Sequence, residues 1–417
     1  MEVMKGYDKK GIGIIPQDWG IAPVSELVRK GDGIKIGPFG SQLKKELLVK
    51  RGFKVYGQEN VFHKNLEIGN RYLTKNHFIK LQSCELSEGD FIVSMMGTIG
   101  KTMVMPKSFE KGIMDSHLLR LRLRGDLIDT KFLSHIFESK TLLDQVFKLS
   151  VGGIMDGLSS RIVKMILIPL PPLAEQKAIA EVLSDTDNLI QSLEKQIEKK
   201  RMIKQGVMQE LLTPKENWEK IKLSKVIDVN RGGSPRPIQN YITTSSHGVN
   251  WIKIGDTSSL SKFITESKEK IISEGVQYSR KVNVGDFLLS NSMSFGRPYI
   301  LRIEGCIHDG WLVLQNYQSS FDTEFLYYTL MSKDVFNQYL AKASGSGVLN
   351  LNKELVKTIE LNRPKNLIEQ TRIAKILSDM DSGLGALEKK LNKYKAIKKG
   401  LMQSLLTGKI RLLQRKV

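Results

Sequence analysis

Several short motifs in this chain resemble fragments of catalytic sites, but none of them is complete. Gly97-Thr98-Ile99-Gly100-Lys101-Thr102 resembles the end of a nucleotide-binding P-loop, yet Met95 occupies the position at which that loop needs its first glycine. The sequence also lacks the Asn-Pro-Pro-Tyr or Asp-Pro-Pro-Tyr tetrapeptide of the amino-methyltransferases. We therefore predict that this polypeptide alone neither hydrolyses nucleotides nor transfers methyl groups.

Patterns typical of nucleases and of metal sites are equally incomplete. Glu138-Ser139-Lys140 and Glu266-Ser267-Lys268 have the Glu-x-Lys form found in some nucleases, but neither has a convincing aspartate partner. Cys84 and Cys306 are the two cysteines of the chain and lie far apart in the sequence. That spacing argues against a disulfide framework and against a thiolate zinc site.

Two histidines lie near a pair of aspartates that recur at equivalent positions. Asp115 aligns with Asp309 when the two halves of the chain are compared, but His117 and His308 do not align with each other. A shared catalytic histidine is therefore not expected, and structural hydrogen bonding is the role predicted for both. No cofactor or metal is expected in this chain.

The strong positive charge indicates a polyanionic partner. The formal net charge is +20 and the isoelectric point is near 9.6. Segments 175–213 and 369–407 carry −1 and +4, so the remaining +17 lies in the rest of the chain. A field of this sign attracts nucleic acid. The alternative is a basic surface that binds nothing.

Basic and amide side chains outside these two segments are the DNA-binding candidates. Arginine suits guanine and asparagine or glutamine suits adenine, whereas most lysines are expected to contact phosphate. Lys101 and Arg297 each follow a glycine in equivalent predicted loops, where the backbone could approach a phosphate. The candidates are Lys44, Lys45, Lys50, Arg51, Gln58, Asn60, Lys64, Lys75, Lys101, Arg231, Arg236, Lys253, Arg280, Asn291 and Arg297.

The elements that must position these residues are duplicated. Residues 175–213 and 369–407 align without a gap at a constant offset of 194, and roughly half of the paired positions are identical. Apolar residues three and four apart run along each copy, which is the pattern of a coiled-coil seam. Pro171-Pro172 precedes the first helix and Pro214 follows it, while Gly408 ends the second.

A helix of this length with one narrow apolar stripe needs a partner, and its duplicate is the obvious one. An antiparallel pair would place the two globular segments at opposite ends, related by a pseudo-two-fold axis. Gly206 and Gly400 predict close approach of the two backbones. Packing alone competes here with docking of another protein, for which the candidate residues are Leu193, Ile197, Gly206, Met208, Leu387, Leu391, Gly400 and Met402.

The globular segments are duplicated more loosely, and each is predicted to be a mixed α/β domain. Residues 89–94 match 285–290, and Ser150–Gly153 corresponds to Ser344–Gly347. The predicted strands are Phe91–Val93, Leu119–Leu123, Lys253–Gly255 and Trp311–Leu314, and the predicted helical stretches are Thr130–Leu149 and Asp322–Lys342. The stretches between them differ, including Lys44–Lys64 and Ile238–Ser258. Two equal scaffolds with different loops suggest two different targets.

As a whole, the chain resembles the specificity subunits of type I restriction–modification systems. The resemblance rests on Leu170-Pro171-Pro172-Leu173-Ala174-Glu175-Gln176, its degenerate second copy at residues 362–370, the start at Gly13–Trp19 and the Leu-Leu-Thr ends of both helices. It implies target recognition domains at 1–172 and 214–366, spacer helices at 173–213 and 367–408, and a basic tail at 409–417. The second helix departs from the pattern, because no Pro-Pro pair precedes Glu369.

The resemblance also implies the partners. Each recognition domain would read one half of a bipartite double-stranded DNA sequence, and two modification subunits would dock on the helices and methylate adenine with their own S-adenosylmethionine. Restriction subunits, using ATP and Mg²⁺, would complete a nuclease. Because the two domains differ, we expect an asymmetric, interrupted target.

Two other classes stay open: a stand-alone DNA-binding regulator and a structural coiled-coil protein. The sequence holds no run of 18 or more apolar residues and no secretory signal, which favours a cytoplasmic protein and disfavours a membrane partner.

Overall fold

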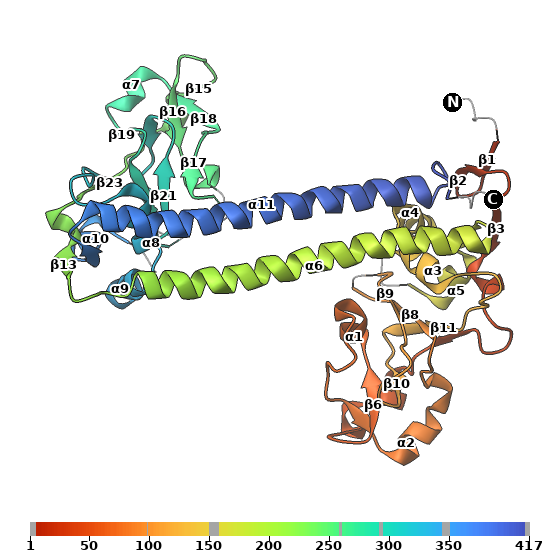
Figure 1. Cartoon of the computed structure of the whole chain (residues 1–417). Helices are drawn as coiled ribbons and strands as arrows, with labels where there is room; N and C mark the ends of the chain where they lie inside the picture. Colours follow the sequence, from red (N-terminus) through yellow and green to blue (C-terminus); the bar gives the residue numbers. More distant parts are fainter. Residues whose placement is uncertain are drawn as a thin grey trace. The chain divides into compact units, whose positions relative to one another are not determined.

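The computed structural model describes residues 6–97, 99–149, 158–257, 261–291, 295–343 and 351–412 (Figure 1). The chain forms two compact units. Unit 1 consists of Met1–Glu194 with Lys390–Val417, and unit 2 consists of Lys195–Lys389. Each unit therefore contains one globular part and one half of each long helix. The matching segments Ser150–Gly153 and Ser344–Gly347, and residues 413–417 of the predicted tail, lie outside the described residues.

Unit 1 is built on two four-stranded sheets and two small strand pairs. The first sheet is antiparallel, with the order β4 (Ile34–Ile36), β11 (Leu118–Leu121), β8 (Phe91–Ser94) and β9 (Thr102–Val104). The second has the order β10 (Gly112–Met114), β6 (Phe53–Tyr56), β7 (Tyr72–Leu73) and β5 (Leu48–Val49), and its β10–β6 pair is parallel. The small pairs are β1 (Tyr7–Lys10) with β2 (Gly13–Pro16), and β3 (Gly20–Pro23) with β12 (Leu167–Leu170).

Unit 2 repeats the two sheets with one strand added to each, and it repeats one of the two small pairs. Its first sheet has the order β14 (Asp228–Arg231), β23 (Trp311–Gln315), β20 (Phe287–Ser290), β21 (Pro298–Leu301) and β17 (Phe263–Ile264). Its second has the order β15 (Ile242–Thr243), β18 (Glu269–Ile271), β16 (Val249–Ile252), β22 (Gly305–Ile307) and β19 (Arg280–Val282), with β16 parallel to β22. The strand pair β13 (Trp218–Lys222) with β24 (Glu360–Pro364) corresponds to β3 with β12.

Helices complete both units. Unit 1 holds α1 (Gln58–His63), α2 (Lys75–Lys80), α3 (Thr130–Phe137), α4 (Lys140–Leu149) and α5 (Ser160–Met165), and unit 2 holds α7 (Ser273–Val276), α8 (Thr323–Leu330), α9 (Lys333–Ala343) and α10 (Lys353–Lys357). The long helices are α6 (Leu173–Leu211) and α11 (Leu367–Leu405), of 39 residues each. Among the described residues, none of these helices is both long and apolar enough to cross a bilayer.

Most of the predicted elements are present, and two predictions are wrong in detail. Lys253–Gly255 is not a strand, because the Asp256 carboxylate accepts the backbone N–H of Lys253 at 2.8 Å and caps a 3₁₀ turn. Each of the two predicted helical stretches contains two separate helices, α3 and α4 in unit 1 and α8 and α9 in unit 2. The break in unit 1 falls at Ser139, whose hydroxyl accepts the Leu142 N–H at 3.3 Å and so starts a new helix. Ser332 does the same in unit 2.

The main core of each unit joins the first sheet to helices from three places in the sequence. In unit 1, Phe132 of α3, Leu183 of α6 and Leu405 of α11 are buried together. In unit 2, Phe325 of α8 and Leu377 of α11 occupy the equivalent places. Each leucine of this kind contributes roughly 1.5–3 kcal/mol through removal of apolar surface from water. In unit 1, α3, α4 and α5 gather beside the first half of α6 (Figure 1).

Within each unit the two long helices run antiparallel, as predicted. In unit 1, Lys395 pairs with Glu194 at 2.7 Å, and Lys398 pairs with Asp187 at 2.7 Å, so numbers rise along one helix as they fall along the other. The equivalent pairs in unit 2 are Arg201 with Glu388 and Lys204 with Asp381. The duplication therefore preserves the ion pairs as well as the apolar stripe.

The predicted close approach at two helix glycines is wrong. A Cβ added at Gly206 or at Gly400 would meet nothing within 4 Å, so both positions face open space. Glycine costs about 1 kcal/mol of helix propensity relative to alanine, and no close packing at these two positions offsets that cost.

The C-terminal segment closes unit 1 against its first strands. The Arg411 guanidinium binds the carboxylates of Asp18 at 2.7 Å and of Glu175 at 2.8 Å. Trp19 donates its indole N–H to Glu175 at 3.3 Å, and the Tyr7 hydroxyl donates to the Gly408 carbonyl at 2.8 Å. These two carboxylates raise the pKa of Arg411. Unit 1 is thus assembled from both ends of the described chain.

Candidate nucleic-acid interface

Three of the predicted DNA-binding residues contact Asp309 in unit 2, together with Ser234. Its carboxylate accepts hydrogen bonds from the Ser234 hydroxyl at 2.9 Å and from Arg236 at 3.4 Å. Its backbone carbonyl accepts from Arg231 Nε at 3.1 Å and from the Asn291 amide at 3.3 Å. The structure thus brings together residues that are up to 78 positions apart in the sequence.

A third arginine joins this group and makes it strongly basic. Arg280 Nε donates to the Arg231 carbonyl at 3.4 Å, and Arg236 is 82% exposed. Burial alone would raise the pKa of Asp309. The Ser234 hydrogen bond and the nearby His308 and Arg231 outweigh this effect, so the pKa of Asp309 is lowered. With Asp309 ionised, three arginines against one carboxylate leave a net positive site that suits a polyanion.

In each unit, a glycine packs tightly against the turn that carries the aspartate. A Cβ at Gly232 would lie 2.0 Å from the His308 carbonyl oxygen, so the segment after β14 can approach the Asp309 turn only without a side chain. In unit 1, a Cβ at Gly37 would lie 1.9 Å from the Asp115 carbonyl oxygen. A glycine therefore packs directly against the Asp115 carbonyl in unit 1 and against the residue before Asp309 in unit 2.

The unit 1 counterpart contains two residues that the sequence did not point to. Arg71 Nη1 binds Asp115 at 3.0 Å, and Arg71 Nη2 binds Glu59 at 2.8 Å. The Asp115 carboxylate also accepts the His117 backbone N–H at 3.0 Å. Arg71 precedes Asp115 by 44 positions in a stretch without a duplicate, so only the Asp115/Asp309 match hinted at this site.

Two of the predicted candidates have other partners. Asn60 is 1% exposed, its amide donates to the carbonyls of Asn65 and Ile68, and its oxygen accepts the Gly57 N–H at 2.9 Å. Its predicted role as a base reader is therefore wrong in this conformation. Lys253 is held in an ion pair with Glu269.

The remaining unit 1 candidates lie on the surface, except for one that is half-buried. Gln58 is half-buried at the first position of α1. The exposed residues are Lys44, Lys45, Lys50, Arg51, Lys64, Lys75 and Lys101. They remain candidates for phosphate contacts.

Lys101 and Arg297 occupy equivalent turns, as the sequence indicated. Both follow a glycine with positive φ, Gly100 at 79° and Gly296 at 71°. Lys101 is exposed, whereas Arg297 is half-buried with its guanidinium 5.5 Å from the centre of the Tyr299 ring. Of these two residues, Lys101 is the one that presents an exposed cation at this turn.

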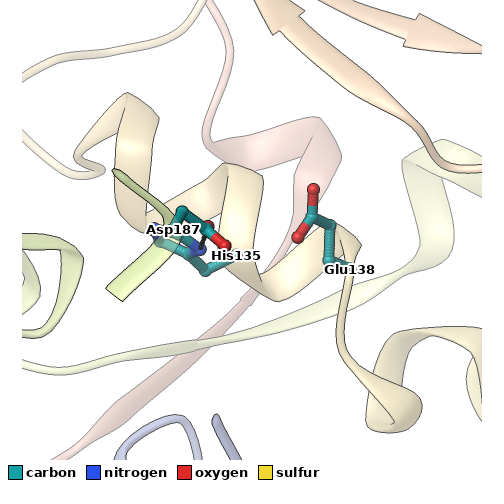
Figure 2. A group of neighbouring side chains, drawn as sticks. All are labelled: His135, Glu138 and Asp187. Carbon is teal, nitrogen blue, oxygen red and sulfur yellow. Dashed lines mark ion pairs between the residues drawn. The ribbon is translucent and has the colours of Figure 1, made fainter. Parts of the chain in front are cut away.

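A histidine and two carboxylates in unit 1 resemble a metal site (Figure 2). His135 and Glu138 lie one turn apart on and just after α3, and Asp187 faces them from α6, with ligand atoms within 4.8 Å of one another. Lys398 lies between the carboxylates, 3.1 Å from Glu138 and 2.7 Å from Asp187. Its ammonium group occupies the place of a cation, so this group of side chains joins three helices instead.

The predicted partner-docking residues are mostly inside the protein. Leu193 and Ile197 are 3% and 4% exposed. Met208 and Met402 pack against the main cores of units 2 and 1, and Leu387 and Leu391 are half-buried.

Unit 2 also has a large groove, which offers more accessible docking surface. Its volume is about 1350 Å³, and its lining includes Met208, Leu212, Tyr327, Phe336 and Lys262. Phe336 is 43% exposed. Burial lowers the pKa of Lys262 to about 8, and its ammonium group is paired with the Glu324 carboxylate.

Comparison with known proteins places these two units in one family. The model of the type I restriction modification DNA specificity domain matches residues 32–200 and again residues 215–397. The chain belongs to this family. The predicted resemblance to specificity subunits is confirmed, and each match covers one scaffold together with much of its long helix.

One relative of the type I specificity family matches along almost the whole chain, and another matches along part of it. The MjaVIII specificity subunit of Methanocaldococcus jannaschii is 28% identical over 430 residues, covering 95% of this chain and 94% of the relative. The EcoKI specificity subunit of Escherichia coli is 25% identical over 177 residues, covering 41% and 36%.

Solved structures show the same fold. A chain from a study of complex assembly in the type I R-M system has a TM-score of 0.61 at 16% identity, covering 95% of this chain and 99% of its own. The S subunit from M. genitalium has a TM-score of 0.57 at 17% identity, covering 97% and 98%. The predicted tandem of mixed α/β domains, each followed by a long helix, is confirmed.

Proposed function

We propose that this protein is the DNA-reading subunit of a type I restriction–modification complex and recognises an asymmetric, bipartite sequence. The observation that carries the proposal is the pairing of two DNA specificity domains whose equivalent aspartates have different neighbours. Asp115 lies beside Glu59 and Arg71, whereas Asp309 lies among three arginines. Different side chains at one position of the same scaffold read different bases.

In this proposal the chain itself performs no chemistry. It supplies the address, and two methyltransferase subunits supply adenine methylation with S-adenosylmethionine. Restriction subunits add ATP- and Mg²⁺-dependent cleavage. The named relatives are specificity subunits of restriction enzymes, and one structural relative comes from work on assembly of such a complex, which supports partners of this kind.

The groove of unit 2 is the surface we propose for contact with one of these partners. It combines exposed apolar side chains, such as Phe336, with the charged groups of Lys333 and Asp334 on its wall. An apolar centre with a polar rim is the usual composition of a protein–protein interface.

The decisive experiment is to map methylated adenines across the genome of a host that produces this chain together with a type I methyltransferase subunit. We expect an interrupted motif whose two halves differ. A palindromic or uninterrupted motif would contradict the proposed reading. Purification tests the alternatives, because a stand-alone regulator would bind DNA without a methyltransferase, and a structural protein would show no sequence preference.

A further inference from the structure

We propose that Asp115 and Asp309 are the centres of two base-reading sites of opposite charge. Unit 1 would read a cytosine amino group, and unit 2 would read a guanine edge. This inference rests on the proposed DNA-reading function and assigns one base to each half of the target.

The two sites share one frame. Asp115 directly follows the last residue of β10, and Asp309 lies two residues after the end of β22. Each of these strands belongs to a parallel pair. The Asp115 N–H donates to the Tyr56 carbonyl at 2.8 Å, beyond the β6–β10 pair. In unit 2, the His308 N–H donates to the Ile252 carbonyl at 3.4 Å, beyond β16–β22. With Gly37 and Gly232 packed against these turns, the backbone of both anchors is fixed.

Unit 2 has the chemistry of a guanine reader. The carboxylate of Asp309 holds Arg236 by one terminal nitrogen, while 82% of that side chain stays exposed to a ligand. Arginine can donate two hydrogen bonds to the O6 and N7 atoms of guanine in the major groove. A carboxylate behind the guanidinium limits its rotation and lowers the entropy lost when the base is bound.

Unit 1 has the opposite chemistry, although it also contains an arginine. Both terminal nitrogens of Arg71 are engaged, one with Asp115 and the other with Glu59. Two carboxylates against one guanidinium leave a net negative group, and the Glu59 side chain is 38% exposed. An exposed carboxylate with free lone pairs accepts a hydrogen bond from the N4 amino group of cytosine.

Removal of Glu59 should therefore convert the first site into the second kind. In the Glu59→Ala variant, Arg71 would be held by Asp115 alone, as Arg236 is held by Asp309. We expect the base preference at one position of the unit 1 half-site to change from cytosine to guanine. In the Arg236→Ala variant, the unit 2 half-site should lose about tenfold of its preference for guanine at one position.

The experiment is selection of bound DNA from a pool randomised in both half-sites, with the full-length chain in its methyltransferase complex. Exposed residues of the same charge supply the controls: Glu88→Ala in unit 1 and Lys225→Ala in unit 2, both of which should keep the wild-type motif. Thermal melting of each variant excludes loss of folding as the cause of a change.

The outcomes separate the inference from the function on which it rests. A wild-type complex with no sequence preference in either half would defeat the DNA-reading function itself. A clear wild-type motif that Glu59→Ala leaves unchanged, or merely weakens equally at all positions, would overturn the charge-based assignment alone. A change confined to one position of one half-site supports it.

Discussion

At the scale of single residues, His135 has an unusual environment. It is 5% exposed, its Nε2 lies 3.2 Å from the Ser184 hydroxyl, and among the described residues its Nδ1 has no hydrogen-bond partner. Burial lowers its pKa, and the cations of Lys398 and Lys64 act in the same direction, while Asp187 and Glu138 oppose them. The net effect keeps this imidazole neutral in the folded protein near neutral pH.

This environment predicts loss of stability in mild acid. Because the folded pKa lies below the unfolded value near 6.5, the unfolded chain binds the proton first as the pH falls. The contribution of His135 is thus complete above pH 6.5 and is lost as the pH falls through the lowered pKa. We expect the melting temperature to drop between pH 7.5 and pH 5.5, and to drop less in the His135→Gln variant.

The matched control is His63→Gln, at an exposed position at the end of α1. It should keep the wild-type pH dependence. Equal acid sensitivity of the wild type and His135→Gln would show that other groups determine the effect.

Residue roles were the least predictable part from sequence. Arg231, Arg236, Arg280 and Asn291 were named from residue type alone, and the fold gathers them around Asp309. Residue type also suggested Asn60, but its amide satisfies three backbone groups instead. Residues that meet from distant loops have no characteristic spacing in the sequence. Residue type can therefore identify candidates, but it does not show which of them lie together.

At the scale of elements, a buried glutamine links each long helix to its domain. The Gln176 side chain accepts the Asp129 N–H at 2.9 Å and donates to the Leu127 and Pro171 carbonyls at 3.0 Å. Gln370 makes the same three kinds of bond in unit 2, with the Asp322 N–H and the Ser320 and Pro364 carbonyls. Each glutamine fixes the start of a helix to the residue that caps α3 or α8.

Truncation of these glutamines should destabilise one unit at a time. Gln176→Ala leaves buried backbone groups without partners, at a cost of about 2 kcal/mol or more. Hydrogen exchange followed by mass spectrometry should show lost protection in unit 1, and Gln370→Ala should do the same in unit 2. The exposed Gln209→Ala is the control. Equal loss throughout the chain in both variants would contradict this division.

The elements themselves were largely predictable, because periodicity and duplication reinforce each other. Both long helices begin where the sequence indicates, after Pro171-Pro172 and at Leu367, and their antiparallel pairing follows from one apolar stripe on each. The glycine prediction failed because a small residue in a helix marks close packing only when a neighbour is present. At Gly206 and Gly400 no atom lies near enough.

At the scale of the whole molecule, the units do not follow the order of the chain. Unit 2 is one continuous segment, Lys195–Lys389, whereas unit 1 is made of two segments. The division falls inside both long helices, so a compact unit is a domain with two helix halves. From the sequence we expected the boundaries at the ends of the long helices. The apolar residues repeat evenly along each helix, so the sequence does not show where one compact unit ends and the other begins.

A continuous compact segment should fold independently. We expect residues 195–389, produced alone, to give a cooperative thermal transition and the same pattern of hydrogen-exchange protection as in the full chain. A short glycine–serine linker between Glu194 and Lys390 should likewise preserve unit 1, since Glu194 and Lys395 already form an ion pair. A fragment with helical signal but no cooperative transition would contradict independence.

The closure of unit 1 by Arg411 has a consequence for synthesis. Glu175 is 3% exposed and shares its carboxylate between Trp19 and Arg411, so a buried acid that precedes unit 2 in the sequence pairs with a cation that follows unit 2. The ribosome delivers every residue of unit 2 before it delivers Arg411. Unit 1 can therefore complete this ion pair only after the whole of unit 2 has been synthesised.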